Sequence, residues 1–307
     1  MKMGWAAVIV TTACGTSATA QVARISSRVD GSMLSVSVNP SVHAGAIDSL
    51  TFRGVEYVDN YDHGRQIQTA LQVDNLGECY NPTEAGSKAD AAAGKSSSLI
   101  RLASSRGNVL KTETRAAFWL APRETYEKSC SPFRRDSVAE NTQVRSDYTI
   151  GRTTRFYGAA IPNLLLIDVT INFPEQRNTA SIEALTGYMP RQFTSFYSYD
   201  PRRQRLQHLR AASAEGDTNV PVIVATPDGQ NAMGVFSKEI GVPRRDRAYY
   251  AYFYFPGAAA TAKWSCVFSE PYIRAGTTLS YSCPIAVGTL EEVTAAFDAY
   301  ARANGRK

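Results

Sequence analysis

The sequence predicts an all-β protein, a large antiparallel β-sandwich with one C-terminal helix. Several segments alternate apolar and polar residues with period two, and they are rich in β-branched and aromatic side chains. Turn pairs such as Asp30-Gly31 and Pro256-Gly257 separate these segments. A clear helical period is present near the C-terminus. Together these features indicate roughly fourteen strands at the spacing typical of a sandwich.

The clearest strands share this alternation, and they are residues 33–38, 98–102, 166–173 and 249–255. Residues 181–188 form a further apolar segment, which contains the single acid Glu183. An acid in such a strand is expected to be paired or to belong to a site, because a buried charge without a partner is costly. Residues 87–98 are rich in Ala, Ser and Gly, and we expect a flexible loop there.

The helix is expected over residues 289–303. Thr289 and Glu292 have the spacing of a capping box, in which each side chain bonds the other residue's backbone N–H. An apolar stripe follows, formed by Leu290, Val293, Phe297 and Tyr300.

The first twenty residues resemble a secretory signal peptide, with Lys2, an apolar stretch over residues 5–10, and Ala18-Thr19-Ala20 before Gln21. Lipidation of Cys14 is less favoured, because residues 11–13 lack the usual aliphatic residue. No later segment has 18 consecutive apolar residues, so no membrane span is expected. We therefore expect a signal peptide over residues 1–20 and one β-sandwich domain over residues 21–307, in a secreted or periplasmic protein.

Removal of such a signal takes away Lys2 and Cys14, which lowers the formal net charge from +5 to +4. This modest charge and the expected export disfavour nucleic-acid binding. Four cysteines remain, and they can pair in three ways. Pairing between neighbours along the chain gives the expected disulfides, Cys79 with Cys130 and Cys266 with Cys283. No metal site or cofactor is expected, because no cysteine pair has ligand spacing and no complete nucleotide-binding motif occurs.

Polar residues gather in two nearby segments, residues 61–68 and 78–86. The first holds Asp62, His63, Arg65 and Gln66, and the second holds Glu78, Tyr80, Asn81 and Glu84. Such side chains are costly to bury unless they are paired. A sugar-binding cleft uses the same residue types, because amides and guanidinium groups bind hydroxyls, aromatic rings pack on sugar rings, and carboxylates transfer protons.

Hydrolysis of a glycosidic bond requires two carboxylates. We expect Glu84 and either Glu78 or Glu183 to act as acid and base, with Asp62, Arg65, Gln66 and Asn81 orienting the sugar. A structural role for Glu84 as a hydrogen-bonding loop residue is equally consistent with the sequence. Arg65 has a structural alternative too, an ion pair with Asp59 or Asp62.

His63 is the single histidine of the cluster and a candidate proton donor or acceptor. Its structural alternative is a hydrogen-bonded histidine with no part in catalysis. The basic residues 202–210 are either a solvated segment or an attraction for an acidic polymer. Further aromatic residues are expected to pack the sheets, with a few of them stacking on sugar rings: Phe193, Phe196, Tyr197, Tyr199, Tyr249, Tyr250, Tyr252 and Tyr254.

Residues 45–56, followed by Asn60 and Gly64-Arg65-Gln66, resemble the opening strands of galactose-mutarotase-like proteins. The resemblance covers about the first third of the chain after residue 20. It implies a large antiparallel supersandwich, a fold shared by aldose epimerases and by domains of glycoside hydrolases and polysaccharide lyases. It also implies that Arg65 contacts the sugar. The family's epimerase pair of histidines has no match, since only His63 and His208 follow that strand, so simple aldose epimerase activity is not expected.

Three functions agree with these features. The first is a secreted glycoside hydrolase that cleaves a polysaccharide or oligosaccharide with paired carboxylates. The second is a polysaccharide lyase, in which His63 or Tyr80 removes a proton and Arg65 neutralises the carboxylate of an acidic glycan. The third is a non-catalytic carbohydrate-binding module. In each of them the partner is a carbohydrate.

Overall fold

The computed structural model describes residues 21–132, 137–209, 215–241 and 247–305. The expected signal peptide with Cys14, and Arg210 of the basic segment, lie outside these residues. The strands of the first half are β1 (Ala23–Val29), β2 (Ser32–Val38), β3 (Ser49–Phe52), β4 (Val55–Glu56), β5 (Gln68–Val73), β6 (Pro82–Thr83), β7 (Leu99–Arg106), β8 (Val109–Phe118), β9 (Arg145–Phe156) and β10 (Leu164–Asn172).

The strands of the second half are β11 (Arg177–Met189), β12 (Ser195–Asp200), β13 (Arg205–Leu209), β14 (Glu215–Thr218), β15 (Val222–Ala225), β16 (Ala232–Val235), β17 (Ala248–Phe255), β18 (Thr261–Ile273), β19 (Thr278–Ser282) and β20 (Ile285–Gly288). Two short helical elements complete the fold, a 3₁₀ helix η1 (Gly77–Tyr80) and an α-helix α1 (Leu290–Ala303).

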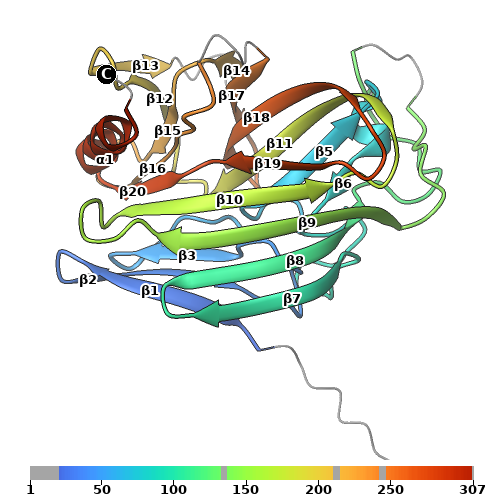
Figure 1. The fold of residues 1–307 in the computed structure, drawn as a ribbon, viewed down its shortest axis with the longest axis horizontal. Helices are drawn as coiled ribbons and strands as arrows, with labels where there is room; N and C mark the ends of the chain where they lie inside the picture. Colours follow the sequence, from blue (N-terminus) through green and yellow to red (C-terminus); the bar gives the residue numbers. More distant parts are fainter. Residues whose placement is uncertain (1–20, 133–136, 210–214, 242–246, 306–307) are drawn as a thin grey trace, which may run out of the picture.

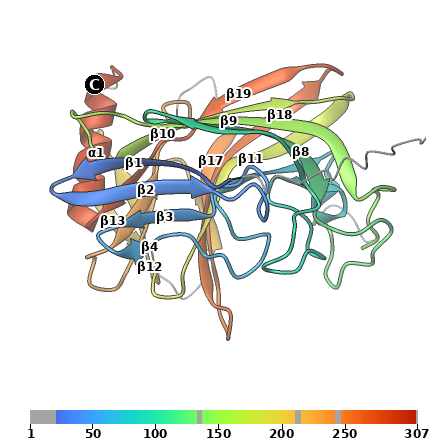
Figure 2. The ribbon, with the colours of Figure 1, turned by 90° about the horizontal axis from the view of Figure 1, so that it is seen from below.

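The strands form two antiparallel sheets (Figure 1). One has the order β1-β2-β3-β4. The other has the order β13-β12-β15-β16-β20-β10-β9-β8-β6-β5-β11-β18-β17-β14, with β19 paired to β10 and β7 paired to β8. The smaller sheet lies beside β7 and β8, and Figure 2 shows it below β9 and β10. The prediction of a large antiparallel β-sandwich with one C-terminal helix is confirmed.

One core cluster joins the sheets. It contains Val36 of β2, Ile150 of β9, Leu165 of β10, Leu71 of β5 and Trp264 of β18, all of which are fully buried. Burial of large apolar side chains from every layer holds the sandwich together, since each such side chain contributes about 1.5–3 kcal/mol when it leaves water. The opposite face of β5, β11, β18 and β17 remains free of this core and becomes the floor of the site described below.

Helix α1 covers a second, smaller core over β15, β16 and β20. Thr289 accepts a hydrogen bond from the Glu292 backbone, and the Glu292 side chain accepts one from the Thr289 backbone, so the predicted capping box is present. Phe297 packs on Gly234 of β16, where a Cβ would collide with the ring. No helix in the described part of the chain has the length and apolar character needed to cross a membrane.

Both expected disulfides are present, Cys79–Cys130 and Cys266–Cys283. The first ties η1 to the segment before residue 133, and the second ties β18 to the residue after β19. Beside the second, the rings of Phe268 and Tyr281 stack with centroids 4.3 Å apart. The two bonds therefore fasten the sheet at two places far apart in sequence.

Thiol titration provides a direct check of this pairing. A chain that begins at Gln21 and is produced by an oxidising export route is expected to show no reactive thiol under denaturing conditions, because all four of its cysteines are paired. After reduction the same sample should show four thiols. Two or more thiols per unreduced chain would contradict the proposed pairing.

Candidate functional site

A cleft of about 1090 Å³ lies on the face of β5, β11, β18, β17 and β14 that the main core leaves free. The turn around residues 62–65 and the segment 78–83 form two of its walls. Five of the residues expected at a site line it: Asp62, Arg65, Glu78, Asn81 and Glu183. Four others do not line it: His63, Gln66, Tyr80 and Glu84.

Strand alternation explains which side chains reach the cleft. Gln68, Ala70 and Gln72 of β5 face it, while Leu71 and Val73 between them face the core. On β11 the alternation of side chains between cleft and core is interrupted by a β-bulge after Glu183, where the register shifts against both neighbouring strands. Ser181 and Glu183 therefore face the cleft before the bulge, and Thr186 and Tyr188 face it afterwards.

Glu183 is paired with a lysine from the next strand. Lys263 Nζ of β18 lies 2.7 Å from Glu183 Oε1, and Ser265 Oγ donates to the same oxygen at 3.3 Å. Burial lowers the pKa of Lys263, but the Glu183 carboxylate and Tyr188 raise it by more, so the net pKa lies above its ordinary value. The lysine therefore stays charged beside the Glu183 carboxyl.

Glu78 lies in a different environment. Its carboxyl accepts hydrogen bonds from two neutral amides, Asn81 Nδ2 at 2.8 Å and Gln72 Nε2 at 3.2 Å. Burial raises the pKa of Glu78 above its ordinary value, and the nearby Glu183 charge raises it further. The hydrogen bonds and Lys263 offset this only in part. Glu78 is thus a carboxyl of the cleft whose surroundings favour its protonated form. Burial and the neighbouring Glu215 also raise the pKa of Asp217, which lines the same cleft.

The backbone holds Glu78 firmly. The N–H of Glu78 donates to the Cys130 carbonyl at 3.0 Å, and the neighbouring Cys79 is disulfide-bonded to Cys130. Gly77, with φ +55°, passes so close to the same carbonyl that a Cβ there would collide with it. A short, cross-linked 3₁₀ turn therefore fixes the carboxyl at the cleft wall.

Arg65 occupies one end of the cleft. Its guanidinium lies 3.0 Å from Asp59 and 3.2 Å from Asp62, and it donates to the Ala259 carbonyl at 2.7 Å. The structural interpretation of Arg65 is therefore confirmed for both aspartates. Arg65 still lines the cleft while it holds both aspartates.

Two tyrosines complete the polar lining. Burial raises the pKa of Tyr188 and of Tyr249. Both phenols are therefore neutral at ordinary pH, where they act as hydrogen-bond donors rather than bases.

Glu84 lies in the interior of the sandwich, away from the cleft. It is fully buried, and its carboxylate forms an ion pair with Arg152 of β9 and accepts the Thr69 N–H at 3.1 Å. Arg152 also donates to the carbonyls of Gly45 and Ile67, each at 3.2 Å. The environment matches the structural alternative for Glu84, because these contacts join three separate segments inside the core.

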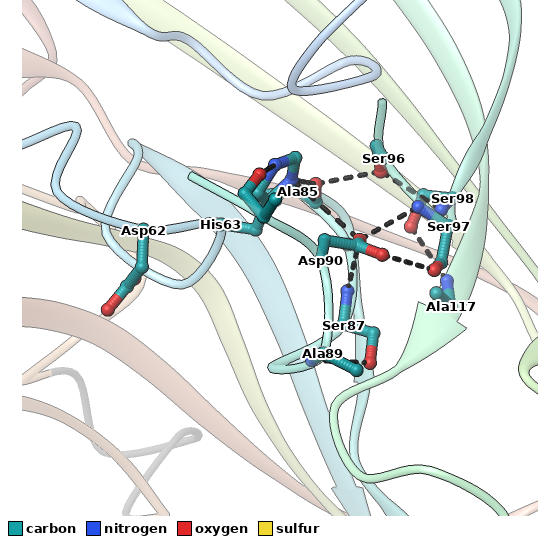
Figure 3. A network of polar contacts seen from close by, with 12 residues as sticks. Asp62, His63, Ala85, Ser87, Ala89, Asp90, Ser96, Ser97, Ser98 and Ala117 are labelled. Atoms are coloured by element: carbon teal, nitrogen blue, oxygen red, sulfur yellow. Dashed lines mark hydrogen bonds and ion pairs between the residues drawn. The ribbon is translucent and has the colours of Figure 1, made fainter. Parts of the chain in front are cut away.

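His63 is buried behind the cleft wall, and Figure 3 shows it pointing away from its neighbour Asp62. Its Nδ1 lies 3.0 Å from the Ala85 carbonyl and its Nε2 lies 2.8 Å from the Ala91 carbonyl. Asp90 accepts from the Ser87 and Ser97 N–H groups, both at 2.8 Å, in the same network. Both ring nitrogens of His63 are therefore in contact with backbone carbonyls. These contacts join His63 to the segment that follows residue 84.

Gln66 and Tyr80 are also engaged elsewhere. The Gln66 amide is fully buried and donates to the Asp62 carbonyl at 2.7 Å. Tyr80 donates to Glu175 at 2.8 Å, and the Arg177 guanidinium lies 4.5 Å from its ring centre. Burial and the Glu175 contact raise the pKa of Tyr80 above its ordinary value. Gln68, two residues after Gln66, lines the cleft instead.

The sequence analysis did not single out Lys263, Tyr188, Phe253 or Phe255, which all line the cleft. The sequence did contain a signal for Lys263. It is the single cation in a largely apolar strand, just as Glu183 is the single acid in its own apolar segment. Tyr249 was named and does line the cleft, whereas Tyr250, Tyr252 and Tyr254 pack against the core from the other face of β17. In the described part of the chain, no three His, Cys, Asp or Glu side chains gather as metal ligands.

Comparisons with known proteins found similar structures but no sequence match. No protein-family model and no curated protein matches this chain. A galactose mutarotase related enzyme from Lactobacillus acidophilus has a similar structure, with a TM-score of 0.47 and 8% identity over 86% of this chain and 98% of its own.

Two larger enzymes are similar over part of their length. An alpha-mannosidase from Enterococcus faecalis has a TM-score of 0.48 and 11% identity over 87% of this chain and 30% of its own. A heparan sulfate lyase from Pedobacter heparinus has a TM-score of 0.45 and 9% identity over 87% of this chain and 35% of its own. This chain therefore spans about a third of each enzyme, and at these identities the likeness concerns the fold alone.

Proposed function

We propose that this protein is an exported carbohydrate-active enzyme that hydrolyses glycosidic bonds with Glu78 and Glu183. One observation carries the proposal. Two carboxyl groups from separate segments line one large cleft in different surroundings: Glu78 is bonded to neutral amides and has a raised pKa, whereas Glu183 is paired with the charged Lys263. Such a pair is what glycoside hydrolysis requires, since one group must give a proton and the other must accept one or attack.

In the proposed reaction Glu78 donates its proton to the glycosidic oxygen as the C–O bond breaks. Glu183, paired with Lys263, either activates the attacking water or attacks the anomeric carbon itself. If Glu183 activates the water, it takes the water's proton as the hydroxyl adds to the anomeric carbon, and exchange with solvent then returns a proton to Glu78. If Glu183 attacks, water later displaces it from the anomeric carbon and gives its proton directly to Glu78. Asp62, Arg65 and Asn81 line the same cleft and are proposed to bind the sugar hydroxyls.

Elimination is less well supported. The residues expected to act as its base, His63 and Tyr80, both lie outside the cleft lining. Burial raises the pKa of the cleft tyrosines, which makes each of them a poorer base. The two disulfides agree with the proposed secreted or periplasmic location, because such bonds persist in oxidising compartments.

Digestion of a glycan panel tests the proposal. Each glycan is incubated with the protein, and new reducing ends and the ultraviolet absorbance of unsaturated products are followed in parallel. We expect reducing ends without unsaturation from at least one glycan. Both signals together would show a lyase, and binding with neither signal would show a non-catalytic module; each of these outcomes would overturn hydrolysis.

The protonation of Glu78 predicts a pH dependence. Because the protonated form is the active one, kcat should fall as pH rises through the raised pKa of Glu78. A pH profile of the wild-type enzyme should therefore show a basic limb, and Glu78→Gln should lack it in its residual activity. If the residual activity of Glu78→Gln keeps the same basic limb, the limb must come from the titration of another group.

A further inference from the structure

Three aromatic rings form one wall of the cleft: Tyr188 of β11 and Phe253 and Phe255 of β17, referred to here as the aromatic wall. The rings of Tyr188 and Phe255 are nearly parallel, 20° apart, with centroids 6.1 Å apart. Those of Phe253 and Phe255 are also 20° apart, with centroids 6.2 Å apart. Neighbouring rings in nearly parallel planes give the cleft one continuous apolar surface.

The aromatic wall adjoins the carboxylate pair. Lys263 Nζ lies 5.4 Å from the ring centres of both Tyr188 and Phe253, and its ammonium contacts Glu183. Arg65 donates to the Ala259 carbonyl in the turn that follows Phe255. A molecule resting on the wall therefore lies close to the polar groups of Lys263, Glu183 and Arg65.

The wall is accessible from the cleft. Phe255 has 43% of its surface accessible, and Tyr188 and Phe253 are half-buried, whereas Tyr252 and Tyr254 of the same strand as Phe255 pack against the core. Accessible aromatic rings that line a cleft commonly mark a ligand-binding surface, since burying them against a ligand releases water. The ligand must combine an apolar face with polar edges, because polar groups border the wall.

We propose that the aromatic wall is a subsite that binds the apolar face of a pyranose ring in an uncharged glycan. A pyranose ring has this combination, with C–H bonds on its faces and hydroxyls around its edge. The inference rests on the proposed function, and it identifies the aromatic wall as the part of the cleft that selects the sugar.

The charges of the cleft indicate why the glycan is uncharged. Among the described lining residues, acidic side chains outnumber cations even without the protonated Glu78, with Asp62, Glu183, Glu215 and Asp217 against Arg65 and Lys263. The two cations already contact carboxylates. A uronic acid chain would therefore meet repulsion without a free cation to offset it, in a cleft where partial burial strengthens electrostatic effects.

Binding measured by calorimetry tests the subsite with defined probes: cellohexaose, xylohexaose, mannohexaose, maltohexaose and hexagalacturonate. Short incubations at low temperature, with product analysis afterwards, separate binding from cleavage. We expect at least one neutral hexamer to bind and Phe255→Ala to weaken it about three- to tenfold, in line with an aromatic contact. Phe255→Trp should retain the affinity. Tyr272→Ala is the matched control, because Tyr272 is 55% exposed on β18 and does not line the cleft.

Each outcome is decisive. Equal binding by wild type and Phe255→Ala would overturn the stacking subsite while leaving hydrolysis by Glu78 and Glu183 intact. Tighter binding of hexagalacturonate than of every neutral hexamer would overturn the preference for uncharged glycans. Absence of binding to all five probes, by a protein that unfolds cooperatively, would overturn the subsite, and the panel digestion would then decide the proposed function separately.

Discussion

Replacing Glu78 with Gln is expected to lower kcat on an unactivated glycan by about 10²–10⁴-fold, the range that a positioned general acid contributes. The carboxyl lines the cleft, and burial favours its protonated form, so it is the proton donor of the proposed reaction. Gln has nearly the same shape but cannot give up a proton. The loss should therefore appear in kcat rather than in the stability of the fold.

The choice of substrate sharpens this experiment. An aryl glycoside with an acidic phenol as leaving group needs little protonation, so Glu78→Gln should retain far more of its activity on that substrate. Glu113→Gln, on the exposed part of β8, serves as the matched control and should change neither rate. An equal loss on both substrates would show that Glu78 does not act as the general acid.

Replacing Arg152 with Leu is expected to destabilise the protein by about 3–5 kcal/mol, because it leaves the buried Glu84 without its ionic partner. The substitution also removes the donors to the Gly45 and Ile67 carbonyls. Urea unfolding followed by fluorescence measures the difference in free energy of unfolding.

Arg155→Leu is the matched control for this prediction. Arg155 lies on the same strand as Arg152, but its ion pair with Asp168 is partly exposed, and its loss should cost less than about 1 kcal/mol. The double variant Glu84→Leu/Arg152→Leu should be more stable than Arg152→Leu alone, because it removes the unpaired charge. Equal effects of the two single arginine variants would contradict a structural role for the buried pair.

The fold followed from local patterns in the sequence. Period-two alternation predicts strands because one face of each strand packs on a core, and the long strands β9 and β10 show this pattern in their burial. The capping box at Thr289 placed the helix start correctly, since it depends only on residues three apart. The expected strand number was too low because strands as short as β4 and β6, with two residues each, carry no periodic signal.

The site was only partly predictable, because its key contacts join distant segments. Glu84 and Glu78 look alike in sequence, yet Glu84 meets Arg152 across the sandwich while Glu78 meets only amides and the cleft. The partner of Glu183 is Lys263, which follows it by 80 residues. Neither pairing has a local signature.

The bulge in β11 hid a further part of the site. Strict alternation from Glu183 would place Thr186 and Tyr188 on the core face, whereas the extra residue at the bulge turns both into the cleft. Such a phase change depends on how the strand pairs with its neighbours, which the residues of the strand alone do not specify.

Cleavage in water enriched in heavy oxygen tests the central claim most directly. Once the panel has identified a substrate, hydrolysis with Glu78 and Glu183 should place one heavy oxygen at the new reducing end of every product, as seen by mass spectrometry. Glu183→Gln should give almost no labelled product in the same time, while its thermal unfolding remains cooperative. Unlabelled products with unsaturated ends, or undiminished labelling by Glu183→Gln, would contradict the account.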